Sequence, residues 1–391
     1  MGLFGGAKRE LIGVDIGSYA IKAAYVAPGR SGPELVALAS IRTPPGAIED
    51  GIVTDVAATA AALRELLDAA GLTVRDAATA VGGPRVIARP QTFPHMSEAR
   101  LRQTALYEAE KFIAFSLEES IVEPQIVSER QTEDGRMLDV MVVAAQTQLV
   151  DSRVQVLQRA GLSPAFVDIE AFALLRSMIY GTHDPDVLQS NVGIVRLGES
   201  YGDITIVASG SYVLYRTLPG AGRALTEAIA AQLGVTYHEA EAIKETEAVA
   251  VTPDVAGALN ERSARVSEAI QPVLDDLTYE LRLSLGFFQA QFQDVSEGGT
   301  VRHLLLTGGT SVMRNLDRYL AAAVGVPVSR RQFIDSLALD RGRFDPAYLA
   351  AASPLAGVAV GLTLTNHMKT GSYAFAADPS QFGVALQRRQ Q

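Results

Sequence analysis

The stretch Leu11–Val26 constrains the fold of this chain more than any other. It begins as an apolar strand, meets Asp15 and Gly17, and resumes at Ala20 as a run of small and β-branched residues. Two such runs joined by a short Gly-Ser turn predict a β-hairpin. The turn glycine lets the backbone bend and lets a ligand approach it closely. The hairpin therefore predicts a phosphate-binding turn or, if nothing else in the chain matches it, a plain hairpin with a polar tip.

The polar residues of this hairpin suit a polyphosphate. The backbone amides of Gly17, Ser18 and Tyr19, together with the Ser18 hydroxyl, can form an anion-binding nest. Asp15 ends the first strand, where a carboxylate can hold a hydrated divalent cation against phosphates. Lys22 follows seven residues later and places a positive charge on the return strand.

The same pattern returns 181 residues later, where Val195-Arg-Leu-Gly198 matches Val14-Asp-Ile-Gly17. Both segments end a strand, precede a polar turn and lead into small and β-branched residues. A third turn, Gly308-Gly-Thr310, lies between a buried strand and a helix start, where bare backbone admits a base or sugar. Taken alone, this third turn is explained equally well as an ordinary strand–helix connection. The order of the three elements favours two hairpins that clamp a polyphosphate.

Composition excludes several other classes of protein. There is no cysteine, so disulfide frameworks, thiolate zinc sites and cysteine nucleophiles are absent. A net charge of −10 argues against general nucleic-acid binding. The five histidines show no metal-ligand spacing, and neither a Gly-x-Ser-x-Gly elbow nor a Walker A loop occurs. We also expect no secretory signal and no membrane-spanning helix. The absence of cysteine fits a cytoplasmic protein.

Length and periodicity predict more than one lobe. At 391 residues the chain exceeds one comfortable hydrophobic core. The segment from Val86 to Leu162 reads as strand–helix–strand–strand–helix, which is typical of a small inserted α+β subdomain. The longest helix is predicted over Asn260–Gln293, where apolar residues recur at steps of three or four. A last apolar helix follows Pro354, and the end from Lys369 is expected to fray.

On these residues the chain resembles the actin-like ATPase superfamily, and within it the PilM family of type IV pilus assembly proteins, in the FtsA-like branch. The resemblance covers nearly the whole chain. Gly13–Lys22 looks like the first phosphate loop, Val192–Ile206 occupies the place of the second, and Leu304–Leu316 resembles the adenosine motif. The insertion lies where FtsA and PilM replace the usual second subdomain. Thr43–Gly46 and Tyr107–Ile113 look specifically similar to PilM.

The resemblance implies an α/β, actin-like (ribonuclease-H-like) fold of two lobes with an inserted SHS2-like subdomain. In that scheme subdomain 1A comprises 1–85, 163–190 and 365–391, and the insertion, 1C, comprises 86–162. Subdomain 2A comprises 191–221 and 299–364, and subdomain 2B comprises 222–298.

It also implies ATP or ADP, with Mg²⁺, bound between the lobes. Asp15 is the expected metal ligand, and Asp15 and Glu170 are the catalytic candidates, with Glu170 positioning water. Glu241 and Lys244 match residues that approach the ribose in FtsA-like proteins. The full set of expected nucleotide-binding residues is Gly17, Ser18, Tyr19, Lys22, Arg196, Gly198, Gly222, Glu241, Lys244, Gly308, Gly309 and Thr310.

The second hairpin departs from the superfamily at Arg196, where other members carry an aspartate that helps to hold the metal and its waters. Two outcomes remain open. The guanidinium binds a phosphate directly, or it turns outward into a salt bridge and the site is dead. Because phosphoryl transfer depends on a positioned metal and water, we predict nucleotide binding with slow or no hydrolysis.

For function, the resemblance implies a cytoplasmic scaffold, peripheral at the inner membrane, that binds the N-terminal tail of the membrane protein PilN. The tail would lie in a groove between the first subdomain and the insertion. Pilus motor ATPases are further expected partners, membrane association is indirect, and no nucleic acid is expected. One alternative is an active ATPase or small-molecule kinase, which Arg196 disfavours. Another is an FtsA-like division protein. Such a protein normally carries a C-terminal amphipathic helix, and Gly371–Gln391 does not resemble one.

Overall fold

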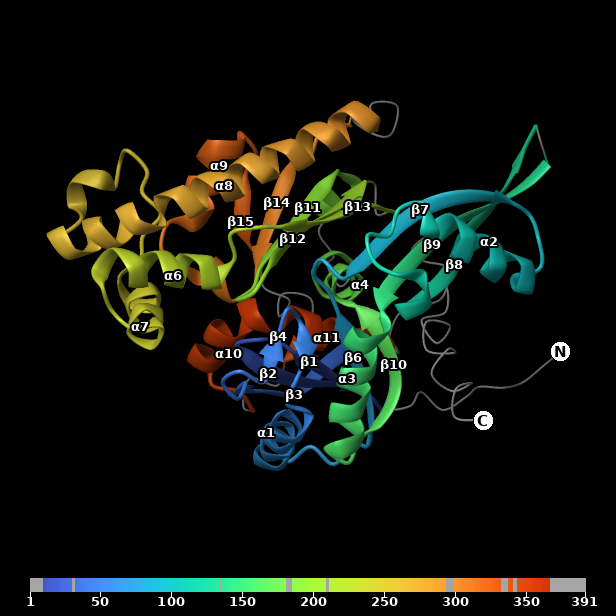
Figure 1. Ribbon diagram of the computed structural model, residues 1–391, viewed down its shortest axis with the longest axis horizontal. Helices are drawn as coiled ribbons and strands as arrows, with labels where there is room; N and C mark the ends of the chain where they lie inside the picture. Colours follow the sequence, from blue (N-terminus) through green and yellow to red (C-terminus); the bar gives the residue numbers. More distant parts are fainter. Residues whose placement is uncertain are drawn as a thin grey trace. The chain divides into compact units, whose positions relative to one another are not determined.

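The computed structural model describes residues 10–29, 32–133, 135–180, 185–208, 211–292, 299–331, 337–339 and 343–365. The chain divides into two compact units. Unit 1 comprises Met1–Gly181 and Phe333–Gln391, and unit 2 comprises Thr182–Gln332. Each unit is built around its own mixed β-sheet (Figure 1).

Unit 1 contains a six-stranded sheet in the order β10-β6-β1-β2-β3-β16. Its central strands, β1 (Ile12–Ile16), β2 (Ala20–Pro28) and β3 (Pro33–Arg42), form consecutive antiparallel pairs. Three flanking strands pair in parallel with their neighbours: β6 (Asp76–Val81), β10 (Ser163–Ile169) and β16 (Ala338–Leu339). The first hairpin is therefore the one that the sequence predicts, with its turn at the end of β1.

Helices cover both faces of this sheet, which is why β1 is apolar and buried along its whole length. On one face its isoleucines and valine pack with α1 (Val56–Ala69) and α3 (Thr147–Arg159). On the other face lie α4 (Glu170–Leu175), a π-helical turn (Arg176–Tyr180) and α11 (Gly357–Leu364). Gly13 lets α11 approach β1, because a Cβ at this position would lie 1.9 Å from the Ala359 carbonyl oxygen.

The insertion is a small three-stranded sheet covered by one helix. Its strands are β7 (Val86–Pro94), β8 (Ser120–Thr132) and β9 (Gly135–Gln146), in the antiparallel order β7-β9-β8. The helix α2 (Glu98–Glu110) packs on it through Leu101, Ala105 and Ala109. A 3₁₀ helix, Leu117–Glu119, leads from α2 towards β8.

Unit 2 contains a five-stranded sheet in the order β13-β12-β11-β14-β15. The antiparallel strands are β11 (Val192–Leu197), β12 (Gly202–Ala208) and β13 (Ser211–Leu218). Two parallel strands complete the sheet: β14 (His303–Thr307) and β15 (Val328–Arg330). From its other edge, this sheet has the order β15-β14-β11-β12-β13, which corresponds strand by strand to β10-β6-β1-β2-β3 of unit 1. The repeat inferred from the two hairpins therefore extends to the sheets.

The helices of unit 2 share one hydrophobic core with β11, β12 and β14. They are α6 (Gly222–Leu233), α7 (Tyr237–Glu247), α8 (Glu261–Gln291) and α9 (Leu316–Val324). The long helix α8 matches the predicted one within two residues and buries its apolar stripe. Unit 2 also contains the shorter helical segments α5 (Pro185–Gln189), Ala256–Ala258 and Gly309–Val312. Unit 1 contains α10 (Pro346–Ala352) and Ser353–Leu355.

The subdomain boundaries differ from the sequence-based scheme in three places. The scheme included α3 in the insertion, but α3 packs with α1 on the six-stranded sheet of unit 1. The three-stranded sheet of the insertion ends at Gln146, whereas the scheme placed the end of the insertion at 162. Residues 333–364, assigned from sequence to the second lobe, belong to unit 1, because β16 pairs with β3 and α11 packs on β1. Residues 185–190, placed in subdomain 1A by the scheme, are grouped with unit 2. The fraying predicted beyond Lys369 concerns residues outside the described ones.

A second difference concerns the turn at Gly308. The sequence predicts a helix start directly after this turn, but a 3₁₀ helix, Gly309–Val312, comes first and α9 begins only at Leu316. Asn315 separates them in a left-handed conformation, φ 63°. Its side-chain amide donates to the Ala250 carbonyl oxygen at 2.7 Å, which stabilises the break.

Among the described residues, no single helix is long and apolar enough to span a membrane. One bent pair, Pro346–Leu355 with Gly357–Leu364, passes by length and composition, with an angle of 84° between its parts. Every residue of α11 is buried inside unit 1, as in the core helix of a folded domain.

Candidate functional site

The turn between β1 and β2 is held by contacts on both sides. Asp15 and Lys22 are cross-strand partners, and Lys22 Nζ donates to Asp15 Oδ2 at 3.0 Å. The Thr43 hydroxyl donates to the Gly17 carbonyl oxygen at 2.6 Å, and the Arg42 guanidinium carbon lies 3.5 Å from the centre of the Tyr19 ring. This geometry leaves two ammonium protons of Lys22 available to a phosphate.

Asp15 is the predicted metal ligand of the first hairpin, and the carboxylates and imidazoles around it determine which kind of metal site it can form. Among the described residues, no group of three or more His, Cys, Asp or Glu side chains is placed to hold a metal ion. Mg²⁺ bound to nucleotides commonly uses one or two carboxylates plus phosphate oxygens and water. Asp15 therefore fits a metal held mainly by a nucleotide, and it does not fit a metal held by the protein alone.

The turn between β11 and β12 repeats this arrangement with the charges exchanged. Arg196 and Asp203 are cross-strand partners, and Arg196 Nε donates to Asp203 Oδ2 at 2.8 Å. Asp203 is 1% exposed, and the guanidinium carbon of Arg196 lies 4.7 Å from the centre of the Tyr201 ring. Of the two outcomes left open for Arg196, the structure contains the salt bridge, but it lies in the hairpin and is not turned outward.

The second turn is fastened to the start of α6. The Gly222 and Arg223 amides donate to the Gly198 and Glu199 carbonyl oxygens at 2.9 and 2.7 Å. The Glu199 carboxylate accepts from Arg223 Nε at 2.9 Å and from the Tyr237 hydroxyl at 3.1 Å. Partial burial and the Glu199 charge raise the pKa of Tyr237 well above its usual value. Gly222 thus supports the turn through its amide.

The residues expected near the ribose form a compact network. Lys244 Nζ donates to Glu241 Oε2 and to the Thr226 hydroxyl, both at 2.7 Å, and to the Gly222 carbonyl oxygen at 3.1 Å. The Thr226 hydroxyl donates to Glu241 Oε2 at 2.5 Å. The helix that carries the pair, α7, begins with a capping box between Thr236 and Glu239. These contacts fix both charged side chains beside the start of α6.

The turn that follows β14 lies directly against the second hairpin. Gly308 has φ 92°, and a Cβ there would lie 2.4 Å from the Leu197 carbonyl oxygen. The Thr310 hydroxyl donates to the Gly198 carbonyl oxygen at 3.0 Å. Unit 2 therefore brings together the predicted residues around Arg196, Gly198, Gly222 and Gly308. In unit 1, Glu170 is buried at the start of α4, after a strand that β6 separates from β1.

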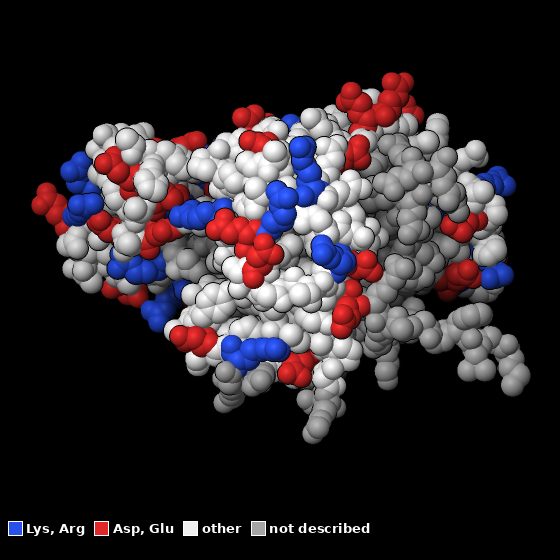
Figure 2. Space-filling view, turned by 90° about the horizontal axis from the view of Figure 1, so that it is seen from below, with Lys and Arg blue, Asp and Glu red and all other residues white. Residues whose placement is uncertain are grey.

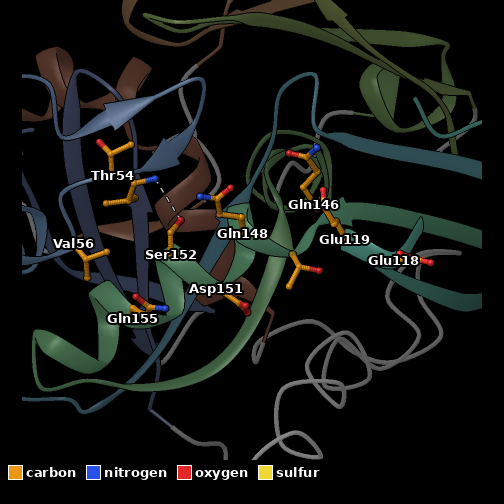
Figure 3. A pocket seen from close by; sticks show the side chains of 11 residues that line it. Thr54, Val56, Glu118, Glu119, Gln146, Gln148, Asp151, Ser152 and Gln155 are labelled. Carbon is orange, nitrogen blue, oxygen red and sulfur yellow. Dashed lines mark hydrogen bonds between the residues drawn. The ribbon is translucent and has the colours of Figure 1, made fainter. Parts of the chain in front are cut away.

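Sequence reasoning identified no residue of a groove, yet unit 1 contains one of about 770 Å³. Its walls come from three segments that lie far apart in the chain (Figure 3). Val53 ends the strand β5 (Ile52–Val53), Thr54 and Val56 follow it, Glu118 and Glu119 belong to the 3₁₀ helix, and the third wall is the start of α3. The residues of this third wall are Gln146, Thr147, Gln148, Asp151, Ser152 and Gln155.

Two arginines hold the walls of this groove together. The hairpin of β4 (Ile48–Glu49) and β5 (Ile52–Val53) forms one wall. Arg153, 2% exposed, donates from Nη1 to the Gly51 carbonyl oxygen of that hairpin at 2.8 Å. Arg85 donates from Nη1 to Gln146 Oε1 at 2.6 Å and forms an ion pair with Asp50 at 3.6 Å. In the sequence, the only trace of this groove is a set of polar residues at helical spacing on α3, at positions 148, 151, 152 and 155.

Charged side chains on the surface show a further property of the molecule. On the face drawn in Figure 2, described acidic and basic side chains alternate, and the basic ones do not gather into one patch. On this face the described charges are therefore of mixed sign.

Two sheets of one strand order, each with a turn after its first strand, define the actin-like, ribonuclease-H-like class of proteins. The solved structure of EutJ from Carboxydothermus hydrogenoformans matches with a TM-score of 0.51 and 16% identity over 90% of this chain and 88% of that one. A diol dehydratase-reactivating factor matches with a TM-score of 0.51 and 12% identity over 92% and 100%. These likenesses show the fold.

The family follows from two closer matches. The family model for the type IV pilus assembly protein PilM matches residues 13–367. A chain of the PilM–PilN type IV pilus biogenesis complex matches with a TM-score of 0.80 and 30% identity, over 93% of this chain and 100% of that chain. This chain belongs to the PilM family of type IV pilus assembly proteins, as its sequence predicted.

Proposed function

We propose that this protein is a scaffold of type IV pilus assembly that binds the N-terminal cytoplasmic tail of PilN in the groove of unit 1. The observation that carries the proposal is the cavity of about 770 Å³ between the insertion and the β4–β5 hairpin. Its volume lies in the range of sites that enclose a small ligand or a short peptide segment. The related PilM–PilN complex supports PilN as the partner. On this proposal the protein acts in the cytoplasm, at the inner membrane.

A blocking substitution tests this proposal. Gln148 is exposed, lines the groove and lies outside the core, so Gln148→Trp fills the cavity without disturbing the fold. We expect it to weaken binding of a PilN tail peptide at least about tenfold, measured by isothermal titration calorimetry. Gln158→Trp is the matched control, because Gln158 is exposed on the same helix but does not line the groove. Equal affinity of the two variants would count against this groove.

We further propose that the protein binds ATP or ADP through the predicted loop residues, with slow or no hydrolysis. Lys22 and the Ser18 hydroxyl suit phosphate oxygens, and the bare backbone at Gly308 suits a base or sugar. A nucleotide would supply the phosphate oxygens that complete a Mg²⁺ site at Asp15. Arg196 stands where the aspartate that would assist a metal is expected, and its ion pair occupies the Asp203 carboxylate.

Thermal unfolding with and without nucleotide tests this second proposal. We expect ATP or ADP with Mg²⁺ to raise the melting temperature, because a ligand that binds only the folded state stabilises it. Lys22→Met should remove most of that increase. Release of phosphate at rates typical of kinases, above about one per second, would contradict the slow hydrolysis.

A further inference from the structure

The groove of unit 1 has a one-sided charge. Three carboxylates line it, those of Glu118, Glu119 and Asp151, and no lysine, arginine or histidine does. Within the described part of the chain, none of these three side chains forms an ion pair or a hydrogen bond. Like charges around one cavity repel each other, and a cation placed among them removes that repulsion.

Two other carboxylates of the insertion are paired with arginines. Glu123, four residues after Glu119, accepts from Arg102 Nη1 at 2.6 Å. Asp139 in β9 pairs with Arg130 at 3.0 Å. Unit 1 thus pairs these two carboxylates with arginines, whereas no described arginine pairs with Glu118, Glu119 or Asp151.

The remaining polar groups of the groove suit a peptide backbone. Gln148 and Gln155 are exposed on α3, two turns apart, and neither side chain takes part in a hydrogen bond with another described residue. A glutamine amide offers both donors and an acceptor, as a peptide unit requires. Their separation along the helix, about 10 Å, corresponds to about three residues of extended chain. Val53 and Val56 add an apolar wall for an uncharged side chain of the same segment.

We propose that the groove selects an extended peptide segment bearing lysine or arginine, with Asp151, Glu118 and Glu119 as the residues that read the positive charge. This inference rests on the proposed function, because it specifies which chemical feature of the PilN tail the groove recognises. A metal ion is the less suitable cation, because no described group of three or more carboxylates and imidazoles is placed to coordinate one.

Binding of tail peptides to the full chain tests the inference. One peptide has the sequence of the PilN tail, and a second has glutamine at each lysine and arginine. The protein variants are Asp151→Asn and the triple variant Asp151→Asn/Glu118→Gln/Glu119→Gln. The control is Glu65→Gln/Asp68→Asn, which removes two exposed carboxylates of α1 that do not line the groove.

We expect Asp151→Asn to weaken binding of the natural peptide about two- to fivefold, and the triple variant about tenfold or more at low salt. The difference should shrink at about 0.5 M salt, because screening weakens exposed charge pairs. The neutral peptide should bind all four proteins with the same, lower affinity. Since the wild-type protein reports the salt dependence by itself, the test does not depend on the folding of any variant.

The possible failures are distinguishable. Tail binding that is unchanged in the triple variant and independent of salt would overturn charge recognition, while binding in the groove would still stand. Absence of any binding by the wild-type protein would overturn the proposed function and this inference together.

Discussion

The hairpins at the centre of the two units carry the same pair of charges with opposite polarity. In β1–β2 the acid, Asp15, lies on the strand before the turn and the base, Lys22, on the return strand. In β11–β12 the base, Arg196, comes first and the acid, Asp203, returns. Both pairs are seven residues apart and both are cross-strand partners. A hairpin of this kind thus requires one acid and one base, and either strand can supply the acid.

The two pairs differ in how far each can rearrange. Lysine is a point charge on a flexible stem, and the side chains of Lys22 and Asp15 are 14% and 10% exposed. Arginine is a planar fork, and Arg196 is held between the 1% exposed side chain of Asp203 and the ring of Tyr201. In the first pair, the Lys22 ammonium can exchange the Asp15 carboxylate for a phosphate. In the second pair, the Arg196 guanidinium is fixed within its sheet.

The largest effect is expected from removing the acid of the second hairpin. Asp203→Ala leaves the Arg196 guanidinium without its partner in a buried site, which costs about 3–5 kcal/mol of folding free energy. Urea unfolding followed by circular dichroism measures this loss. Asp15→Ala in the first hairpin should cost less, about 1–2 kcal/mol, because the flexible stem of Lys22 lets its ammonium turn towards water once the carboxylate is gone. Equal losses in the two hairpins would remove the distinction between them.

The next prediction exchanges the polarity of the second hairpin. The double variant Arg196→Asp/Asp203→Arg keeps one acid and one base across the strands, so it should retain most of the stability that Asp203→Ala loses. It also gives the second hairpin the aspartate that other superfamily members have. We expect phosphate release from ATP to rise about tenfold, which corresponds to about 1.4 kcal/mol in the barrier. A stable double variant without faster phosphate release would show that Arg196 is not what limits hydrolysis.

Sequence was sufficient for the hairpins because their determinants are local. A strand, a Gly-containing turn and a second strand lie within sixteen residues, and the same pattern recurs after 181. The partner of Arg196 in its salt bridge also follows from local spacing, since Asp203 comes seven residues after Arg196, as Lys22 comes seven residues after Asp15.

The groove was beyond sequence reasoning for a different reason. Its walls come from residues 53–56, 118–119 and 146–155, and only the folded unit brings these segments together. Periodicity shows that α3 has a polar side but does not show what faces it. The same limitation explains the boundary of the insertion. The apolar side of α3 fits a small subdomain and a large sheet equally well, and Val156 and Leu157 in fact pack in the core of the large sheet.

A smaller effect compares how the two turns are fastened. The carbonyl oxygen of each turn glycine accepts a threonine hydroxyl, Thr43 for Gly17 and Thr310 for Gly198. Thr43→Val should cost about 1–1.5 kcal/mol in urea unfolding, because it removes the hydrogen bond to the part-buried Gly17 carbonyl oxygen. Thr310→Val should cost less, because Gly198 also accepts from the Gly222 amide at 2.9 Å. The reverse order would mean that the second turn depends on Thr310 more than on α6.

The smallest effect tests the charged contact that only the second turn has. Tyr237→Phe removes the hydrogen bond to Glu199, and because this tyrosine is 43% exposed we expect a loss below about 1 kcal/mol at neutral pH. The pKa of Tyr237 is raised in the folded protein, so its contribution is complete below pH 10, the usual pKa of tyrosine, and falls at higher pH. The difference in unfolding free energy between wild type and Tyr237→Phe should therefore shrink as pH rises above 10. Thr43→Val, which involves no ionisable group, should keep a constant difference from wild type over the same range. Parallel curves for both variants would show that the Tyr237–Glu199 contact does not hold the turn in solution.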